Sequence, residues 1–167
     1  MIVIALGANL NSAVGPPAKT FASALGELAR NGIRIDAVSA LYKTPAWPDP
    51  ADPQFDNAVA QIETAYSPRE LMDILHKIEL LYGRTRGAEN APRTLDIDLI
   101  DYHGRVEAGP PTLPHPRVAQ RGFVLLPLSE IAPDWRHPVS GLSVVELIAA
   151  LPEESRQGVV RSGGAET

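Results

Sequence analysis

Strand-like and helix-like apolar patterns alternate along this chain, and their order restricts its fold more than any other feature. Strand-like patterns occupy residues 1–7, 33–43, 55–64 and 94–102. Helical spacing of apolar residues begins after Pro16 and again after Ser67, and Gly32 and Gly83 mark the two helix ends. The elements therefore follow the order strand, helix, strand, strand, helix, strand.

This order predicts an α+β protein built on a ferredoxin-like βαββαβ sheet, with helices packed on one face of the sheet and a C-terminal extension. Within the extension, Ser143 and Glu146 form a capping-box pattern that predicts a short helix. We expect a single domain over residues 1–152 and a polar tail over residues 153–167, of which residues 158–161 could pair at a sheet edge.

The composition is that of an ordinary globular protein, and it excludes several functional classes. The chain has no cysteine and a net charge of −5, so disulfides, thiolate chemistry and general nucleic-acid binding are not expected. No apolar run approaches the ~20 residues needed to span a bilayer, and the first residues lack the basic region of a signal peptide. We expect a cytoplasmic monomer without membrane or nucleic-acid partners.

Residues 83–100 combine arginines with two aspartates on one strand pattern. The arginines are Arg84, Arg86 and Arg93. Asp96 and Asp98 stand two positions apart, so on a strand both carboxylates project from one face, with Cα atoms roughly 7 Å apart. Two adjacent like charges are unfavourable unless a cation neutralises them. We interpret the pair as Mg²⁺ ligands beside a cationic clamp for phosphates. The alternative is that these arginines and aspartates form solvated surface ion pairs, which contribute little to stability.

The same residues closely resemble the signature segment of the 6-hydroxymethyl-7,8-dihydropterin pyrophosphokinases, a family of folate-pathway enzymes. Further segments match this family in its own order, namely residues 4–10, 41–45, 55–59, 113–117, 121–123 and 127–133. The matches span residues 2 to about 135, which is nearly the whole folded part. Neither common glycine-rich phosphate-binding pattern is present, so ATP would bind by other means.

The resemblance implies a role for individual residues. The catalytic residues would be Arg84, Arg93, Asp96 and Asp98, and the two aspartates would also bind metal. The pterin would be bound by Thr44, Pro45, Trp47, Phe55, Asn57 and Phe123. ATP would be bound by His76, Glu79, Arg86, Thr112, His115 and Arg121. Aromatic rings can stack on the flat pterin, and an amide can complement its mixed hydrogen-bonding edge.

The implied reaction is attack of the 6-hydroxymethyl oxygen of the dihydropterin on the β-phosphorus of ATP, with AMP as the leaving group. Two Mg²⁺ ions would assist as cofactors. Two other functional classes remain open from the residues alone. One is a metal-dependent phosphohydrolase or nucleotidyl transferase that needs no pterin, and the other is a non-catalytic ferredoxin-like sensor of small molecules. Taken singly, Phe55 and Phe123 are equally compatible with core aromatics.

Overall fold

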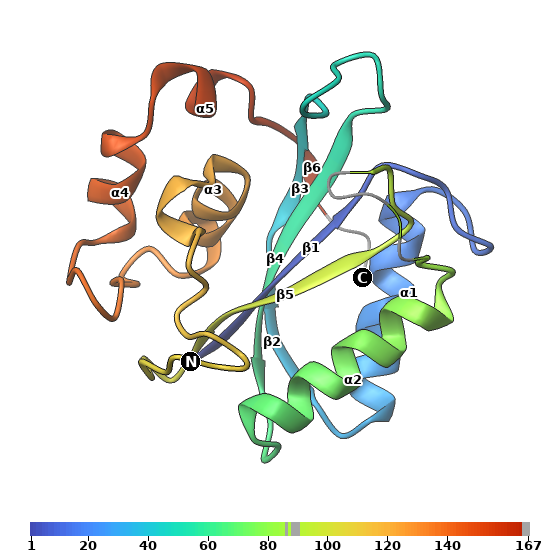
Figure 1. Cartoon of the computed structure of the whole chain (residues 1–167), viewed down its shortest axis with the longest axis horizontal. Helices are drawn as coiled ribbons and strands as arrows, with labels where there is room; N and C mark the ends of the chain where they lie inside the picture. The colour runs from blue at the N-terminus through green and yellow to red at the C-terminus, as the bar shows by residue number, and fades with distance from the viewer. Residues whose placement is uncertain (86, 88–90, 165–167) are drawn as a thin grey trace.

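The computed structural model describes residues 1–85, 87 and 91–164 as a sheet with helices on both of its faces (Figure 1). The described strands are β1 (Ile2–Ala8), β2 (Arg34–Val38), β3 (Ala40–Thr44), β4 (Phe55–Glu63), β5 (Asp96–Tyr102) and β6 (Val160–Gly164). The described helices are α1 (Pro17–Arg30), α2 (Pro68–Leu81), the 3-10 turn η1 (Val118–Gln120), α3 (Gly122–Ile131), α4 (Val144–Ala150) and α5 (Glu153–Gln157).

The sheet has the order β5-β1-β4-β3-β6, and β2 also pairs with β4. All of these pairings are antiparallel, and Ala5 in the central strand β1 lies opposite Val59 of β4 and Asp98 of β5. The α+β class and the βαββαβ order of the first 102 residues are confirmed. The strand expected over residues 33–43 is divided at Ser39 into β2 and β3.

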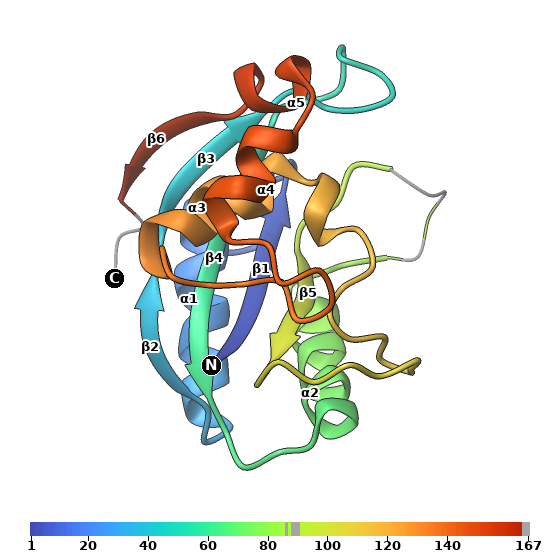
Figure 2. The same cartoon turned by 90° about the vertical axis from the view of Figure 1, so that its left-hand side faces the viewer.

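The two faces of the sheet bury separate cores. On one face, α1 and α2 cover a core that includes Ile4, Phe21, Leu28, Leu75 and Ile97. On the other face, α3 and α4 cover a second core that includes Val3, Val59, Leu125, Leu128 and Leu147. The expectation of helices on one face only is therefore wrong. Figure 2 views the sheet from the α3 and α4 side, with α1 behind it.

The described part of the C-terminal tail contains regular structure. Helix α5 is followed by β6, which pairs with β3 through Val160 opposite Lys43 and Arg161 opposite Tyr42. The sequence indicates that residues 158–161 could pair at a sheet edge. The observed pairing begins at Val160, two residues later, and includes Arg161. The described part of the tail thus supplies β6, the edge strand of the sheet beside β3 (Figure 2).

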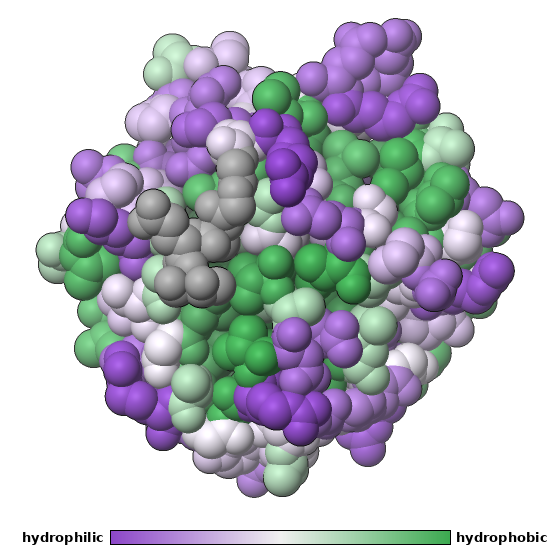
Figure 3. Space-filling view, turned by 180° about the vertical axis from the view of Figure 1, so that it is seen from behind, coloured by the Kyte–Doolittle hydropathy of each residue, from purple (hydrophilic) through white to green (hydrophobic). Residues whose placement is uncertain are grey.

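The surface mixes polar residues with scattered apolar ones. On the side opposite to the view of Figure 1, apolar residues gather near the middle of the face and hydrophilic residues surround them (Figure 3). Across the described ranges, none of the helices combines the length and the hydropathy that a membrane crossing requires.

Candidate active site

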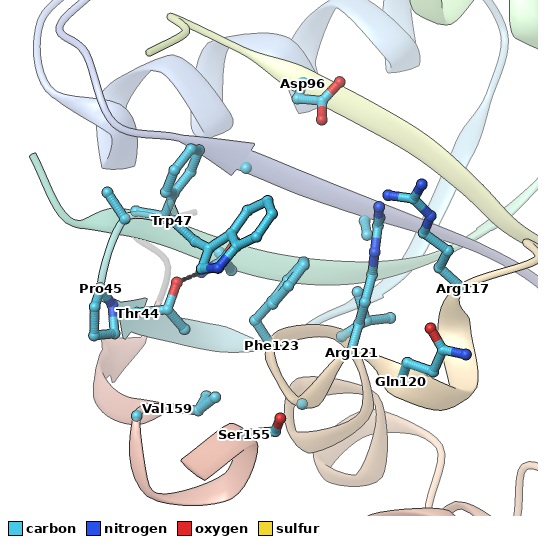
Figure 4. A pocket seen from close by; sticks show the side chains of 18 of the residues that line it. Thr44, Pro45, Trp47, Asp96, Arg117, Gln120, Arg121, Phe123, Ser155 and Val159 are labelled. Atoms are coloured by element: carbon cyan, nitrogen blue, oxygen red, sulfur yellow. Dashed lines mark hydrogen bonds between the residues drawn. The ribbon is translucent and has the colours of Figure 1, made fainter. Parts of the chain in front are cut away.

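A cavity of about 510 Å³ lies between the sheet and the start of α3 (Figure 4). This volume is in the range of sites that enclose small ligands. Ten of the residues selected from the sequence line it, namely Thr44, Pro45, Trp47, Phe55, Asn57, Arg93, Asp96, Asp98, Arg121 and Phe123. They come from β3, β4, β5, α3 and the loops between them, so the fold gathers residues that are distant in sequence.

Strand β5 positions the two aspartates. Ile97 and Leu99 are buried in the core beneath α1 and α2, as the alternation predicts. Asp96 and Asp98 consequently point to the opposite face and line the cavity. Both carboxylates are half-buried, because the start of α3 and the preceding loop cover this end of the sheet.

Arginines neutralise both carboxylates. Arg84 forms an ion pair with Asp96, and Arg93 donates to the other oxygen of Asp96 at 3.0 Å. Arg121 donates to Asp98 at 3.2 Å. Each guanidinium offers several donors, so it can hold a carboxylate and still donate to a phosphate.

Two of these arginines also lie over aromatic rings. The guanidinium carbon of Arg93 is 5.9 Å from the ring centroid of Phe55, and that of Arg121 is 5.5 Å from the ring centroid of Phe123. Phe55 belongs to the sheet and Phe123 to α3. The cavity therefore contains two chains of contact, each running from a phenylalanine through an arginine to an aspartate.

Asn9 fixes the backbone of Arg93. Its buried Oδ1 accepts from the backbone N–H of Arg93 at 2.8 Å, and its Nδ2 donates to the carbonyl of Pro53 at 3.1 Å. Asn9 thereby joins the segment before β5 to the loop before β4. The sequence indicated the segment around Asn9 but no role for it, since a contact across 84 residues leaves no local pattern.

Asn57 has a fixed orientation. Its Nδ2 donates to the carbonyl oxygen of Tyr42 at 3.2 Å and to Oγ1 of Thr44 at 3.1 Å. Because a carbonyl can only accept, the amide nitrogen must lie on this side. The side chain is buried, and because its Nδ2 already donates twice, only its Oδ1 is left to accept a further hydrogen bond. Asn57 thus offers an acceptor to the cavity, although the amide itself carries donors as well.

Glu79 supports the cationic side from α2. It is buried, forms an ion pair with Arg84, and accepts from the backbone N–H of Ile97 at 3.2 Å. Burial raises the pKa of Glu79 to about 7, although Arg84 opposes that shift. Glu79 acts on the cavity through Arg84, whose guanidinium it shares with Asp96.

His115 is held as a neutral ring. Burial, together with the charges of Arg121 and Arg117, lowers its pKa to about 4. The backbone N–H of Arg117 donates to Nδ1 of His115 at 3.1 Å, so Nδ1 is the acceptor and the proton lies on Nε2. His115 is therefore a hydrogen-bond donor near the arginines, and it carries no charge at pH 7.

The remaining predicted residues are placed differently. His76 is exposed on α2, and Thr112 is exposed with its hydroxyl donating to the carbonyl of Ala108 at 3.0 Å. Neither lines the cavity. Arg86 lies outside the described residues. The cavity also has a wall that the sequence did not indicate, formed by Arg117, Gln120, Glu154, Ser155, Gly158 and Val159.

The aspartate pair suits a hard divalent cation. Burial and the charge of Asp96 raise the pKa of Asp98 above its ordinary value, although Arg121 opposes this. A cation bound to both would remove that repulsion, and carboxylate oxygens are ligands that Mg²⁺ accepts. Over the described ranges, no group of three or more histidine, cysteine or acidic side chains could hold a metal. Phosphate oxygens and water are suitable further ligands for such a cation.

Comparisons with known proteins point to one family. The family model described as 7,8-dihydro-6-hydroxymethylpterin-pyrophosphokinase (HPPK) matches residues 3–133. A 2-amino-4-hydroxy-6-hydroxymethyldihydropteridine pyrophosphokinase of Synechocystis sp. is 40% identical over 87% of this chain and 73% of that protein. The Pseudomonas aeruginosa protein of the same name is 37% identical over 98% of each chain. A crystal structure of Plasmodium falciparum HPPK-DHPS has a TM-score of 0.62 at 15% identity, and the match covers 87% of this chain and 42% of that one.

The neutral state of His115 leads to a test by NMR. We expect its ring to show no titration above about pH 5, because its pKa is about 4. Between pH 6.5 and 4 the unfolded chain then binds a proton that the folded protein does not, so the free energy of unfolding falls as the pH is lowered through this window. His115→Gln should reduce this acid dependence and identify the resonance. A His115 midpoint near 6.5 would contradict the assignment.

Proposed function

Because the chain belongs to the 7,8-dihydro-6-hydroxymethylpterin pyrophosphokinase family, and is thus an ATP-dependent pyrophosphokinase of folate biosynthesis, we propose that the cavity beside α3 binds its pterin substrate. The observation that carries this proposal is the pair of contact chains, Phe55 to Asp96 and Phe123 to Asp98. Family membership favours this activity over the phosphohydrolase and the sensor that the sequence left open.

The pterin ring stacks against Phe55 and Phe123. The two rings reach the cavity from the sheet and from α3, and a flat heteroaromatic ring gains offset stacking from each. Oδ1 of Asn57 accepts a hydrogen bond from an N–H on the ring edge. Thr44, Pro45 and Trp47 border the same region (Figure 4). This placement directs the 6-hydroxymethyl group towards the arginines and the aspartates.

ATP lies on the arginine side of the cavity. Arg93 and Arg121 keep donors available for phosphate oxygens while they hold the two carboxylates. Arg84 is held by Glu79 and Asp96, and it stabilises the negative charge of the transferring group. His115 adds an uncharged donor through Nε2. Roles of Arg86, His76 and Thr112 towards ATP remain predictions from the sequence.

The reaction is an in-line displacement at the β-phosphorus. Asp96 and Asp98 would hold Mg²⁺, as two ions, and the metal supplies positive charge that offsets the negative charge of the phosphates. The residues of this chain orient the hydroxymethyl oxygen and the triphosphate in one cavity. His115 is not the base that takes the hydroxyl proton. Its unprotonated nitrogen, Nδ1, already accepts a hydrogen bond from the Arg117 N–H. The loose transition state of phosphoryl transfer requires little help from a base.

A direct assay tests the assignment. The protein is incubated with ATP, Mg²⁺ and 6-hydroxymethyl-7,8-dihydropterin, and AMP is followed by chromatography. We expect AMP only when all three are present. AMP release without the pterin would support the phosphohydrolase or nucleotidyl transferase, and binding without any turnover would support the sensor.

Asp98→Asn should abolish most turnover but leave the fold intact. We expect at least a hundredfold loss of kcat, because the metal loses a charged ligand. Since burial and Asp96 raise the pKa of Asp98, a neutral side chain suits this position, so Tm in EDTA at pH 8 should be equal or higher. Asp134→Asn, at an exposed position, is the control and should match the wild type in both measurements. Near-normal turnover of Asp98→Asn would show that the metal binds elsewhere.

Asn57→Ala should weaken pterin binding selectively. The lost acceptor leaves a ring N–H unpaired in a buried site, which costs about 1–3 kcal/mol. Calorimetric titration with a non-hydrolysable ATP analogue and Mg²⁺ should give an unchanged Kd, whereas the Kd for the pterin should rise. Equal weakening of both ligands would place Asn57 outside the pterin site.

Trp47 should report pterin binding by fluorescence. Its side chain is 72% exposed although it lines the cavity, whereas Trp135 is 5% exposed and donates to Asp101 at 2.8 Å. A bound ring should remove water from Trp47, so pterin should shift the emission of the wild type to shorter wavelength. Trp47→Phe, titrated identically to correct for pterin absorption, should lose this shift. A shift that persists in Trp47→Phe would show that the pterin binds away from this loop.

A further inference from the structure

The C-terminal segment, residues 153–164, lies beyond the residues that the family model matches, which end at residue 133. Even so, four of its residues line the cavity together with Phe123, namely Glu154, Ser155, Gly158 and Val159. In Figure 4, Ser155 and Val159 lie beyond Phe123 and Thr44, on the side away from Asp96. The segment thus borders the aromatic part of the cavity.

The segment touches the first residue of α3 through its backbone. A Cβ atom on Gly122 would lie 2.3 Å from the carbonyl oxygen of Ser155, so only glycine permits this approach. Gly122 immediately precedes Phe123, whose ring lines the cavity. The position of the Ser155 backbone and the start of α3 are therefore coupled.

The segment also lies next to the opposite border of the cavity. A Cβ on Gly158 would lie 3.6 Å from Cδ of Pro45, at ordinary contact distance. Pro45 directly follows β3 and begins the loop that carries Trp47. Between Gly122 and Pro45, residues 155–158 connect the two sides from which the pterin would be enclosed.

Strand β6 and α3 fix the far end of the segment. Val160 and Arg161 pair with Lys43 and Tyr42 of β3. Glu130 of α3 accepts from the hydroxyl of Tyr42 at 2.6 Å and from the backbone N–H of Ala40 at 3.0 Å. Arg161 adds an exposed ion pair to Glu130 at 3.4 Å, which by itself contributes little. The backbone ladder, rather than that ion pair, holds the segment.

We propose that residues 155–159 form a wall of the pterin site and act as a positioning element, with Val159 in contact with the ring and Gly122 as the docking point of the segment. This proposal rests on the assignment of the cavity to the pterin. Ser155 and Val159 lie on the side of Phe123 away from Asp96 (Figure 4), so we expect the effect of the segment to fall on the pterin rather than on ATP.

A pair of neighbouring valines provides the test. Val159 lines the cavity, whereas Val160 is 59% exposed and does not. Val159→Ala should raise the Kd for 6-hydroxymethyl-7,8-dihydropterin about fivefold, as loss of apolar contact predicts. The Kd for a non-hydrolysable ATP analogue with Mg²⁺ should stay within twofold, and Val160→Ala should match the wild type for both ligands.

A pair of glycines tests the docking point independently. Gly122→Ala should displace the Ser155 carbonyl and raise the pterin Kd about tenfold or more. Gly26→Ala is the control, because its nearest neighbour would be an Arg30 side chain at 3.7 Å. Hydrogen exchange without ligand should show faster exchange in β6 of Gly122→Ala and unchanged exchange in α1 and α2. This signal needs no pterin.

The proposal is overturned if Val159→Ala binds the pterin as tightly as Val160→Ala, or if the losses are equal for pterin and ATP analogue. If Gly122→Ala fails to fold, the valine pair still decides. Wild-type protein that binds no pterin, while Gly122→Ala still loosens β6, would instead overturn the assignment of the cavity and leave the docking contact standing.

Discussion

Asp96 accepts from two arginines that come from opposite ends of one loop, Arg84 just after α2 and Arg93 just before β5. The rest of the site depends on this double contact. Arg84 also pairs with the buried Glu79, and Arg93 also lies over the ring of Phe55, so both are connected to Asp96. The protein thereby compensates the charge of its carboxylate before any ligand binds, and each guanidinium has more donors than these contacts use.

The antiparallel sheet separates scaffold from chemistry. The face beneath α1 and α2 is a continuous apolar core, to which β5 contributes Ile97 and Leu99. The other face is covered by α3 and α4, and α3 begins at Gly122, directly after Arg121, which donates to Asp98. The cavity lies between the start of α3, the start of β5 and the adjoining ends of β3 and β4. The polar residues of the cavity therefore lie on one face of the sheet, and the apolar core beneath α1 and α2 lies on the other.

Local pattern and family resemblance together predicted the order of elements along the first 102 residues, both long helices and ten of the residues that line the cavity. What they did not predict depends on contacts between distant segments. Helix α3 is apolar on nearly every side and contains Pro127, so it lacks an amphipathic period. For strand β6 the sequence indicated possible edge pairing of residues 158–161 but not the partner strand, which is β3. Asn9 and Glu130 act by bridging separate segments, which no spacing along the chain reveals.

The fixed amide of Asn57 has a consequence for which form of a ring this cavity admits. Its nitrogen is committed to Tyr42 and Thr44, and a flipped amide would set two oxygens against each other. A ring edge in the lactam form presents an N–H and satisfies the free oxygen. The lactim form presents a nitrogen lone pair at the same place, and the two acceptors repel. One hydrogen bond to a backbone carbonyl and one to a side-chain hydroxyl would thereby let the cavity discriminate between tautomers.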